Sequence, residues 1–528
     1  MRDFELPGRS TAYAQHGMAA TSHPLATLTA LDVLRAGGNA VDAAVAAAAV
    51  QCVVEPHMTG IGGDCFVLYA PATGGVVALN GSGRAPAALT VEHLLGVGMT
   101  AITADSPHAV TVPTAIAGWQ ALLDAHGTRG MDELLRPAIR YAEDGFPITP
   151  RVALDWGRDG AALAVSPAGR DYYLPGGRAP EAGQLLRFPA LARTLRRIAE
   201  GGARAFYEGE LASRMVAALR GFGGVHTEAD FAAAAAEFVE PIHTSYRGTE
   251  VYECPPNGQG FVVLQMLNIL EQFDLAALGQ DTAARLHLLV EAARIGFRDR
   301  DLVLCDTAHA EMPVDRLLDK AYARVLADHI DPDRAMTGLP PHLLEPHPDT
   351  IYLTVVDRDL NAVSFINSIF DGFGSGLVCP ETGVLFHSRG RAFRVDPDHP
   401  NTVAPGKRPL HTIIPGMAFR GGEAWCSFGV MGGHYQPVGQ THLLTRLIDD
   451  GLDPQAAIDA PRLMPYPADI EVEAGIDRTA RLGLIARGHR LLDRSTPLGG
   501  GQAIVIDRER GVLIGGSDPR KDGLALGY

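Results

Sequence analysis

Apolar residues near the start of the chain recur at helical spacing in two consecutive segments. Residues 25–36 carry such a pattern, and the Gly37-Gly38 pair that follows is typical of the end of a helix. Asn39 then offers a side chain suited to cap a second helix, with Asp42 favourably placed in its first turn. The pattern therefore predicts two short helices joined by a glycine turn, the second beginning near Val41.

The pattern then changes to strands and back to helices. Apolar runs at residues 65–70 and 76–79 flank the turn sequence PATGG, which predicts two short strands. Helical patterns dominate from Thr114 to about Ile330, although residues 250–252 look strand-like. The clearest helices are expected at residues 188–199, 210–219 and 260–272.

A second break in the pattern lies at residues 331–349. This stretch, DPDRAMTGLPPHLLEPHPD, is rich in proline and aspartate, which predicts a mobile, exposed connection. A β-hairpin is predicted directly after this stretch. Its first strand is the alternating run at residues 352–357, its turn is 359–361, and its second strand is the run at 362–370. Thr350 is therefore expected where an exposed connection enters a sheet.

Composition and charge narrow the classes of function. The 528 residues are 46% hydrophobic and 20% charged, which is typical of a globular protein with a large core. A formal net charge of −16 argues against nucleic acid as a partner, and a small anionic substrate would need a local basic pocket. The longest apolar stretch, residues 41–54, is too short and too polar to span a membrane. The start MRDFELPGRS lacks a secretory signal, and the six cysteines form no CxxC pair, so we expect a cytoplasmic protein with reduced thiols.

Several familiar motifs are incomplete. The glycine-rich residues 60–64 lie between a predicted helix and a predicted strand, so a tight turn is favoured over a phosphate site. The sequence has no HExxH motif of the kind that binds zinc. Residues 396–401 resemble a calcium-binding loop but lack its distal glutamate. Residues 374–376 lack the spacing of the nucleophile elbow of serine hydrolases. We therefore expect no metal and no cofactor.

The remaining candidate is the hydroxyl-rich β region that begins at Thr350. An Asp-Thr pair alone is common in turns, but here Ser368 follows on the returning strand, and PGKRP (405–409) and Gly432-Gly433 come later. With these blocks the chain resembles the γ-glutamyltranspeptidase family of N-terminal nucleophile hydrolases almost end to end. Further matching blocks are GGNAVDAAVAAA (37–48), VEPHMTGIGGDCF (54–66), PALARTLRRIAEGGARAFYEGELA (189–212), TVVDRDLNAVSF (354–365), GVMGG (429–433) and SDPRKDGLALGY (517–528).

The resemblance implies an α+β fold, an αββα sandwich of two stacked sheets. It also implies cleavage of the chain between Asp349 and Thr350. The large chain 1–349 and the small chain 350–528 would build one domain and stay together as a heterodimer, with a pair of heterodimers as a further expectation.

The resemblance also assigns roles to the candidate residues. Thr350 is the nucleophile, and its freed α-amine, with a reference pKa of about 7.7–8.0, is the base for its own hydroxyl. Ser368 takes the position of the hydroxyl that orients the nucleophile. Gly432 and Gly433 match the pair whose N–H groups form the oxyanion hole.

The sequence departs from the family at the residues that bind a glutamyl group. Where true transpeptidases hold the α-ammonium, this chain has Phe370, Arg389 and Ala392. A serine pair that lines the pocket is replaced by His411-Thr412. The arginine that grips the α-carboxylate is replaced by Ser82, although Arg84 lies two residues on and is a candidate substitute.

These departures predict a substrate other than glutathione. The blocks FINSIFDGFGSGLV (365–378) and HTIIPGM (411–417) look most like the oxamate amidohydrolase branch, which acts on a small amide that bears a carboxylate. Arg389 would then face the carboxylate; the alternative is a surface arginine paired with Asp396 or Asp398. Three other functions stay open. The first is γ-glutamyl hydrolase or transferase activity. The second is acylase activity on β-lactam side chains, in which Phe370 and His411 would form an apolar wall, and the third is an unprocessed scaffold protein without activity.

Overall fold

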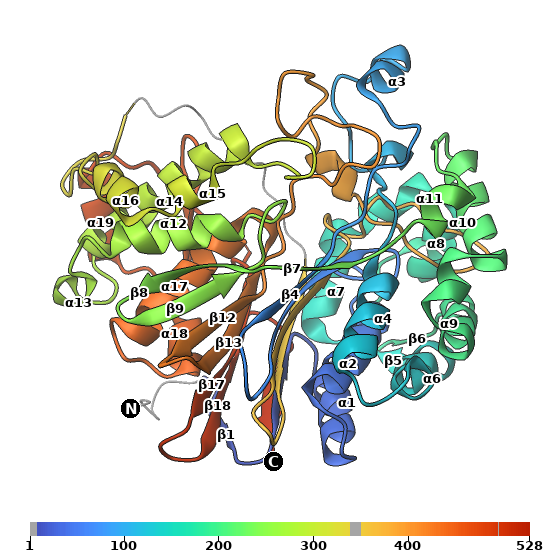
Figure 1. Cartoon of the computed structure of the whole chain (residues 1–528), viewed down its shortest axis with the longest axis horizontal. Coiled ribbons are helices and arrows are strands. Elements are labelled where there is room, and N and C mark those ends of the chain that lie inside the picture. The colour runs from blue at the N-terminus through green and yellow to red at the C-terminus, as the bar shows by residue number, and fades with distance from the viewer. Residues whose placement is uncertain (1–7, 338–349, 495) are drawn as a thin grey trace.

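Two seven-stranded sheets are stacked face to face, and helices cover the outer face of each (Figure 1). The computed structural model describes residues 8–337, 350–494 and 496–528. The layers form the αββα sandwich and the α+β class that the resemblance implied.

The first sheet is antiparallel throughout, with strand order β1-β18-β17-β13-β12-β9-β8. Its strands are β1 (Ala12–Ala14), β8 (Ile242–Tyr246), β9 (Thr249–Glu253), β12 (Gly416–Arg420), β13 (Glu423–Met431), β17 (Gly500–Asp507) and β18 (Val512–Ser517).

The second sheet is also antiparallel, with strand order β19-β2-β10-β11-β3-β4-β7. Its strands are β2 (Met18–Thr21), β3 (Asp64–Ala70), β4 (Val77–Gly81), β7 (Glu237–Val239), β10 (Ile351–Val356), β11 (Ala362–Ser368) and β19 (Leu524–Gly527). Both sheets contain strands from before and from after residue 349, so neither part of the chain completes a sheet alone.

The helices form two outer layers. Those on the second sheet include α1 (Pro24–Arg35), α2 (Ala40–Val54) and α4 (Ala115–His126), with α6 (Arg136–Asp144) and α9 (Pro189–Tyr207) packed outside them. Those on the first sheet are α12 (Gly260–Leu270), α17 (Gln436–Ile448) and α18 (Pro454–Asp459), with α14 (Ala283–Val303) and α16 (Lys320–Ala327) beyond. A small sheet of β14 (Leu463–Pro465), β15 (Ile470–Val472) and β16 (Leu491–Asp493) lies beside α14 and α19 (Arg478–Ala486).

The predicted elements correspond closely to these. The two N-terminal helices are α1 and α2, and Asn39 caps α2 by accepting from the Asp42 N–H at 3.0 Å. The predicted strands at 65–70, 76–79 and 250–252 are β3, β4 and β9, and the predicted hairpin is β10–β11. The predicted connection is only partly testable, because its residues 338–349, including Asp349, lie outside the described residues.

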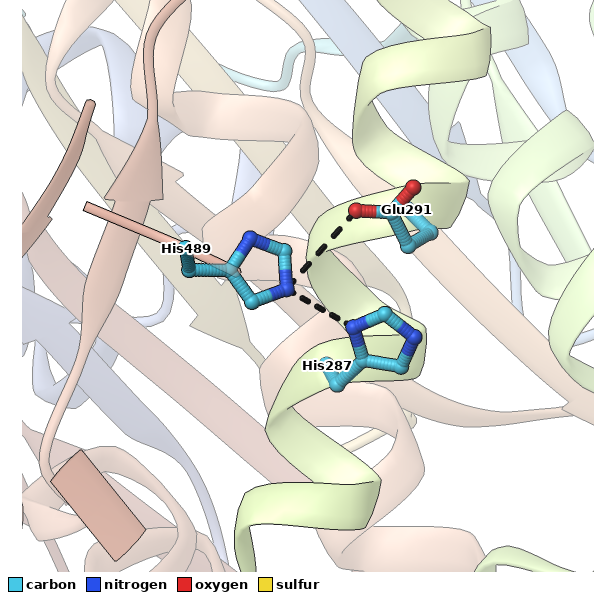
Figure 2. A group of neighbouring side chains, drawn as sticks. All are labelled: His287, Glu291 and His489. Carbon is cyan, nitrogen blue, oxygen red and sulfur yellow. Dashed lines mark hydrogen bonds and ion pairs between the residues drawn. The ribbon is translucent and has the colours of Figure 1, made fainter. Parts of the chain in front are cut away.

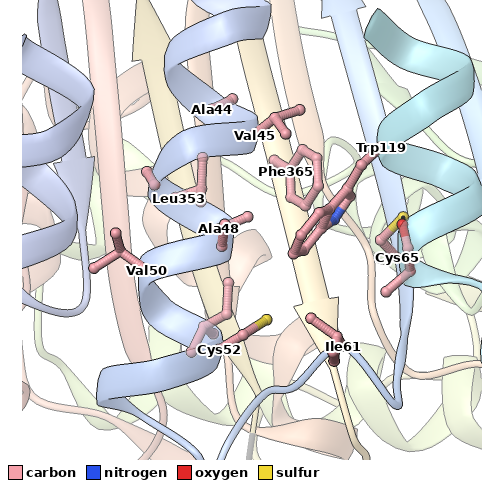
Figure 3. Close-up of a cluster of buried hydrophobic side chains, with 14 of the residues drawn as sticks. Ala44, Val45, Ala48, Val50, Cys52, Ile61, Cys65, Trp119, Leu353 and Phe365 are labelled. Carbon is pink, nitrogen blue, oxygen red and sulfur yellow. Dashed lines mark hydrogen bonds between the residues drawn. The ribbon is translucent and has the colours of Figure 1, made fainter. Parts of the chain in front are cut away.

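The alanine-rich helix α2 packs directly on the centre of the second sheet. Its small side chains, such as Ala44 and Ala48, lie against Leu353 and Phe365 of the β10–β11 hairpin (Figure 3). Because these side chains are short, the helix axis approaches the sheet closely and the cluster excludes water. Trp119 closes the cluster and donates its indole N–H to Asn367 Oδ1 at 3.1 Å.

The two sheets approach each other along β10 and β13. The Thr354 hydroxyl donates to Ser427 Oγ at 2.6 Å. A Cβ added at Gly429 would lie 2.3 Å from the ring of Tyr352, so glycine is what admits that ring. Thr354 of β10 therefore faces Ser427 of β13, and Tyr352 faces Gly429. Each step is two residues because alternate side chains of a strand point to the same face.

Two further observations concern the helices and the cysteines. Among the described residues, none of the helices has both the length and the apolarity to cross a membrane. All six cysteines are free and buried.

We predict that Gly429→Ala lowers the thermal unfolding midpoint, because the new methyl group collides with the Tyr352 ring. Overpacking of this kind costs about 1–3 kcal/mol. The matched control is Gly75→Ala, at an exposed glycine with nothing within 4 Å of the added Cβ. Equal midpoints for the two variants would contradict the close approach of the sheets.

Candidate active site

The pairing of β10 with β11 places Thr350 beside Ser368. Ile351 lies opposite Asn367, so Thr350, one residue earlier, lies opposite Ser368. The two hydroxyl oxygens are 3.2 Å apart, and both residues are buried. Ser368 Oγ also accepts from the Phe370 N–H at 3.0 Å, which fixes its position. The structure thus brings the predicted nucleophile and its predicted orienting hydroxyl into contact.

The next strand extends this row to a carboxylate. Ser368 pairs with Asp64 across β11 and β3, and opposite residues of an antiparallel pair point to one face. Thr350, Ser368 and Asp64 therefore form a polar row across three adjacent strands.

The tight turn predicted at residues 60–64 is confirmed, and it delivers Asp64 to this row. A Cβ added at Gly63 would lie 2.2 Å from the Ser368 carbonyl oxygen, and one at Gly62 would lie 2.2 Å from that of Leu385. Only glycine permits both approaches.

The facing residues of β10 and β13 indicate which part of the first sheet lies nearest to Thr350. Continuing the facing pairs 354–427 and 352–429 by two residues places Thr350 opposite the end of β13 at Met431, next to Gly432. Both glycines have positive φ, 122° and 57°, which favours glycine strongly. Within the described part of the chain, neither of their N–H groups donates to an acceptor. The turn therefore presents two backbone donors near the end of β13.

Gln259, which the sequence did not single out, fixes this turn from behind. Its side-chain Nε2 donates to the Gly433 carbonyl at 3.1 Å and to the Thr412 carbonyl at 2.8 Å. Its Oε1 accepts from Arg300 Nη1 at 2.9 Å, so the orientation of the amide is determined. Gln259 lies far from Gly433 in sequence, and no local pattern signals the contact.

Arg389 is fully buried, with 0% of its surface exposed, so the alternative of a surface arginine paired with Asp396 or Asp398 is wrong. Its Nε and Nη2 donate to the two oxygens of Asp64 at 3.1 and 3.2 Å, and its Nη1 donates to Thr412 Oγ1 at 3.1 Å. Burial alone would raise the pKa of Asp64, but the charge of Arg389 and the contact with His411 outweigh it and hold that pKa well below its usual range.

His411 and Phe370 complete the surroundings of this ion pair. The His411 Nε2–H donates to Asp64 Oδ2 at 2.7 Å, and its Nδ1 accepts from the Ile413 N–H, which sets the tautomer. Burial lowers the pKa of His411 to about 4, so the ring is neutral at pH 7. The Arg389 guanidinium lies 4.3 Å from the centre of the Phe370 ring. Both rings thus pack around the ion pair.

Arg84, in contrast, is already neutralised. It is partly exposed and forms an ion pair with Glu237 at 2.8 Å, and its Nη1 donates to the Gly406 carbonyl at 3.0 Å. Asp306 lies 3.8 Å away. Of the predicted substrate residues, Phe370, Arg389, His411 and Thr412 gather around Asp64, whereas Arg84 contacts a different set of partners.

We predict that Asp64→Asn destabilises the fold by about 3–5 kcal/mol at pH 7, because it leaves Arg389 buried without a counter-charge. The depressed pKa of Asp64 means that its contribution is present above its unfolded pKa of about 3.9 and is lost as the pH falls further. Urea unfolding measures the change. The matched control is Asp398→Asn at an exposed carboxylate, and equal unfolding midpoints for the two variants would rule out a structural ion pair.

Comparison with known proteins identifies the family of this chain. The family model for gamma-glutamyltranspeptidase matches residues 26–528. The glutathione hydrolase-like YwrD proenzyme of Bacillus subtilis is 39% identical over 97% of this chain and 98% of its own. The oxamate amidohydrolase proenzyme of Klebsiella pneumoniae is 36% identical over 98% of this chain and 100% of its own.

A solved structure, cephalosporin acylase from Bacillus halodurans, superposes with a TM-score of 0.93 at 40% identity, covering 100% of this chain and 99% of that one. The three relatives are named as hydrolases or an acylase, and the first two are made as proenzymes. The chain therefore belongs to the γ-glutamyltranspeptidase family and is an enzyme with the N-terminal nucleophile hydrolase fold.

Proposed function

We propose that the protein is a self-processing amidohydrolase whose nucleophile is the hydroxyl of Thr350. The observation that carries this proposal is the contact of Thr350 Oγ1 with Ser368 Oγ at 3.2 Å, at the start of a central strand and opposite the Gly432-Gly433 turn. A buried hydroxyl, an orienting partner and two backbone donors are the parts that acyl transfer needs.

Processing uses these parts on the chain itself. Thr350 Oγ attacks the carbonyl of Asp349, the peptide bond becomes an ester, and water hydrolyses the ester to give chains 1–349 and 350–528. Because both parts of the chain contribute strands to both sheets, the products stay together as a heterodimer. The freed amine of Thr350, with a reference pKa of about 7.7–8.0, then serves as base for its own hydroxyl.

The second reaction acts on an external amide. Thr350 Oγ attacks the amide carbonyl, and the Gly432 and Gly433 N–H groups donate to the oxygen that becomes negative. Loss of the amine leaves an acyl ester on Thr350, and water or another acceptor releases it. Removal of one such donor typically lowers the rate about 10²–10³-fold, so the Gln259 contact that holds this turn supports the rate indirectly.

We further propose that the acyl part of the substrate is small and bears a carboxylate, with no ammonium beside it. Both oxygens of Asp64 accept hydrogen bonds from Arg389 or His411, so this carboxylate is not the partner of a substrate ammonium group. Arg389 has five N–H donors, and three of them have described acceptors. We assign the other two to the substrate carboxylate, which requires the wall around the fully buried Arg389 to open when the substrate binds. The 36% identity with an oxamate amidohydrolase supports the same class of substrate.

Two alternatives from the same family follow from other relatives. The likeness to a glutathione hydrolase-like protein favours γ-glutamyl compounds, and the likeness to a cephalosporin acylase favours larger acyl groups against the Phe370 and His411 rings.

We predict that Thr350→Ala leaves one chain of 528 residues without activity, because no hydroxyl remains to attack. Thr350→Ser, which keeps the hydroxyl, is expected to cleave slowly. Mass spectrometry of the purified variants identifies the new N-terminus. A Thr350→Ala protein that still splits at residue 350 would remove Thr350 from processing. The control is Thr402→Ala, a threonine outside the polar row.

For the substrate, we predict ammonia release from oxamate at a kcat/KM at least about tenfold above hydrolysis of a γ-glutamyl anilide, a difference of roughly 1.4 kcal/mol in the transition state. A β-lactam acyl amide is measured in parallel. Preference for the anilide or the β-lactam would refute the small carboxylate amide and select the corresponding alternative. Absence of turnover in all three assays, with a processed protein, would refute it as well.

A further inference from the structure

A second polar cluster lies among the outer helices that cover the first sheet. His287 and Glu291 are one turn apart on α14, and His489 comes from the segment that follows α19 (Figure 2). One nitrogen or oxygen atom from each side chain lies within 4.8 Å of the other two, and all three residues are buried. The amidohydrolase mechanism uses none of them.

The surroundings of His287 prepare it as a ligand. Its Nε2 lies 2.9 Å from the Asp331 carbonyl oxygen, which carries no hydrogen, so Nε2 must hold the ring proton. Its Nδ1 therefore presents a lone pair toward His489. A ring N–H donated to a backbone carbonyl is the outer contact typical of metal-binding histidines.

His489 faces this lone pair directly. Its Nε2 lies 2.7 Å from His287 Nδ1 and 3.8 Å from Glu291 Oε1. Its Nδ1 is buried and has no hydrogen-bond partner in the described parts of the chain, so without an ion the proton stays on Nε2 and is donated to His287 Nδ1. An ion bound at this point would shift that proton to Nδ1. With the proton on Nδ1, two nitrogen lone pairs and a carboxylate oxygen converge on one point, an arrangement that a cation would stabilise.

The carboxylate is also oriented from outside. Glu291 Oε1 accepts from Arg294 Nη1 at 3.0 Å, and its Oε2 accepts from the Met336 N–H at 3.0 Å. A carboxylate has about four lone-pair sites, so these two contacts leave room for a metal bond. Arg294 and the nearby Arg487 add positive charge that opposes any dication, so binding has to come mainly from the bonds to the two imidazole nitrogens and the carboxylate.

From these contacts we propose that His287, Glu291 and His489 bind one late first-row divalent cation, with zinc as the reference ion. Two imidazole nitrogens and one carboxylate are a ligand set that zinc accepts, with water in the fourth position. Tetrahedral bonds of about 2.0–2.1 Å place two nitrogens about 3.4 Å apart, so the rings need to separate by less than about 1 Å from the 2.7 Å contact.

The site would also join the two products of processing, a role that rests on the proposed cleavage, whereas metal binding itself does not. His287 and Glu291 precede residue 349, and His489 follows it. Residues 331–336 contact the cluster at two points, the Asp331 carbonyl with His287 and the Met336 N–H with Glu291. The Ala335 N–H of the same segment donates to the Arg487 carbonyl at 2.7 Å. A bound cation would hold the end of the large chain against the small chain.

The proposal is tested by titrating zinc into the full-length protein after treatment with a chelator, with binding measured by calorimetry. The visible spectrum of a cobalt-loaded sample is a second readout. We expect one equivalent per chain, and at least about tenfold weaker binding for His489→Gln, since loss of even an outer-shell partner costs about 10–100-fold. The matched control is His243→Gln, an exposed histidine of β8, which should bind as the wild type does. Circular dichroism confirms that each variant is folded.

Wild-type protein that takes up no more zinc than His489→Gln, or a cobalt spectrum identical to that of the free ion, would overturn the proposal and leave a hydrogen-bonded histidine pair. Glu291→Gln gives a second loss of affinity, independent of the histidines. The same titration on Thr350→Ala and on the wild type separates this proposal from the proposed function. Zinc binding by the uncleaved Thr350→Ala chain supports the metal site independently of processing, and a processed wild-type protein that binds no zinc supports the amidohydrolase alone.

Discussion

The register of three antiparallel strands is the constraint on which the active site depends. The pairing of β10 with β11 and of β11 with β3 places Thr350, Ser368 and Asp64 in one row on the face between the sheets. Because side chains alternate with a period of two, a slip by one residue would turn the whole row to the opposite face. The packed alanine-rich helix on that opposite face makes such a slip costly, so the core fixes the position of the proposed nucleophile.

Each part of the site is held by a contact from a distant part of the chain. Asp64 is fixed by Arg389, which lies 325 residues further along, and the Gly433 carbonyl is fixed by Gln259. The carboxylate and the guanidinium neutralise each other in a buried position, where an unpaired charge would be expensive. The site is therefore preorganised by the fold before any substrate arrives, which is the condition under which backbone donors stabilise a developing charge most effectively.

The sequence predicted the local parts of this arrangement and missed the distant ones. The hairpin at 352–370, the capped helix after Asn39 and the tight turn at 60–64 follow from short-range alternation and glycine chemistry, and all are present. The contact of Thr350 with Ser368 follows from that hairpin together with the family resemblance. The burial of Arg389 could not be read from its neighbours, because its partner Asp64 belongs to another strand. The cluster of His287, Glu291 and His489 escaped notice for the same reason, since two helical residues one turn apart gain a third partner only through the fold.

The central claim is that one hydroxyl, that of Thr350, carries the acyl group during turnover. The most direct test is rapid acid quenching of the protein during turnover of a slow substrate, followed by peptide mapping of the small chain by mass spectrometry. The account predicts that the mass of the acyl group appears on the peptide that begins at Thr350 and nowhere else. An acyl group found on another side chain, or sustained turnover with an unmodified Thr350 peptide at every time point, would contradict it.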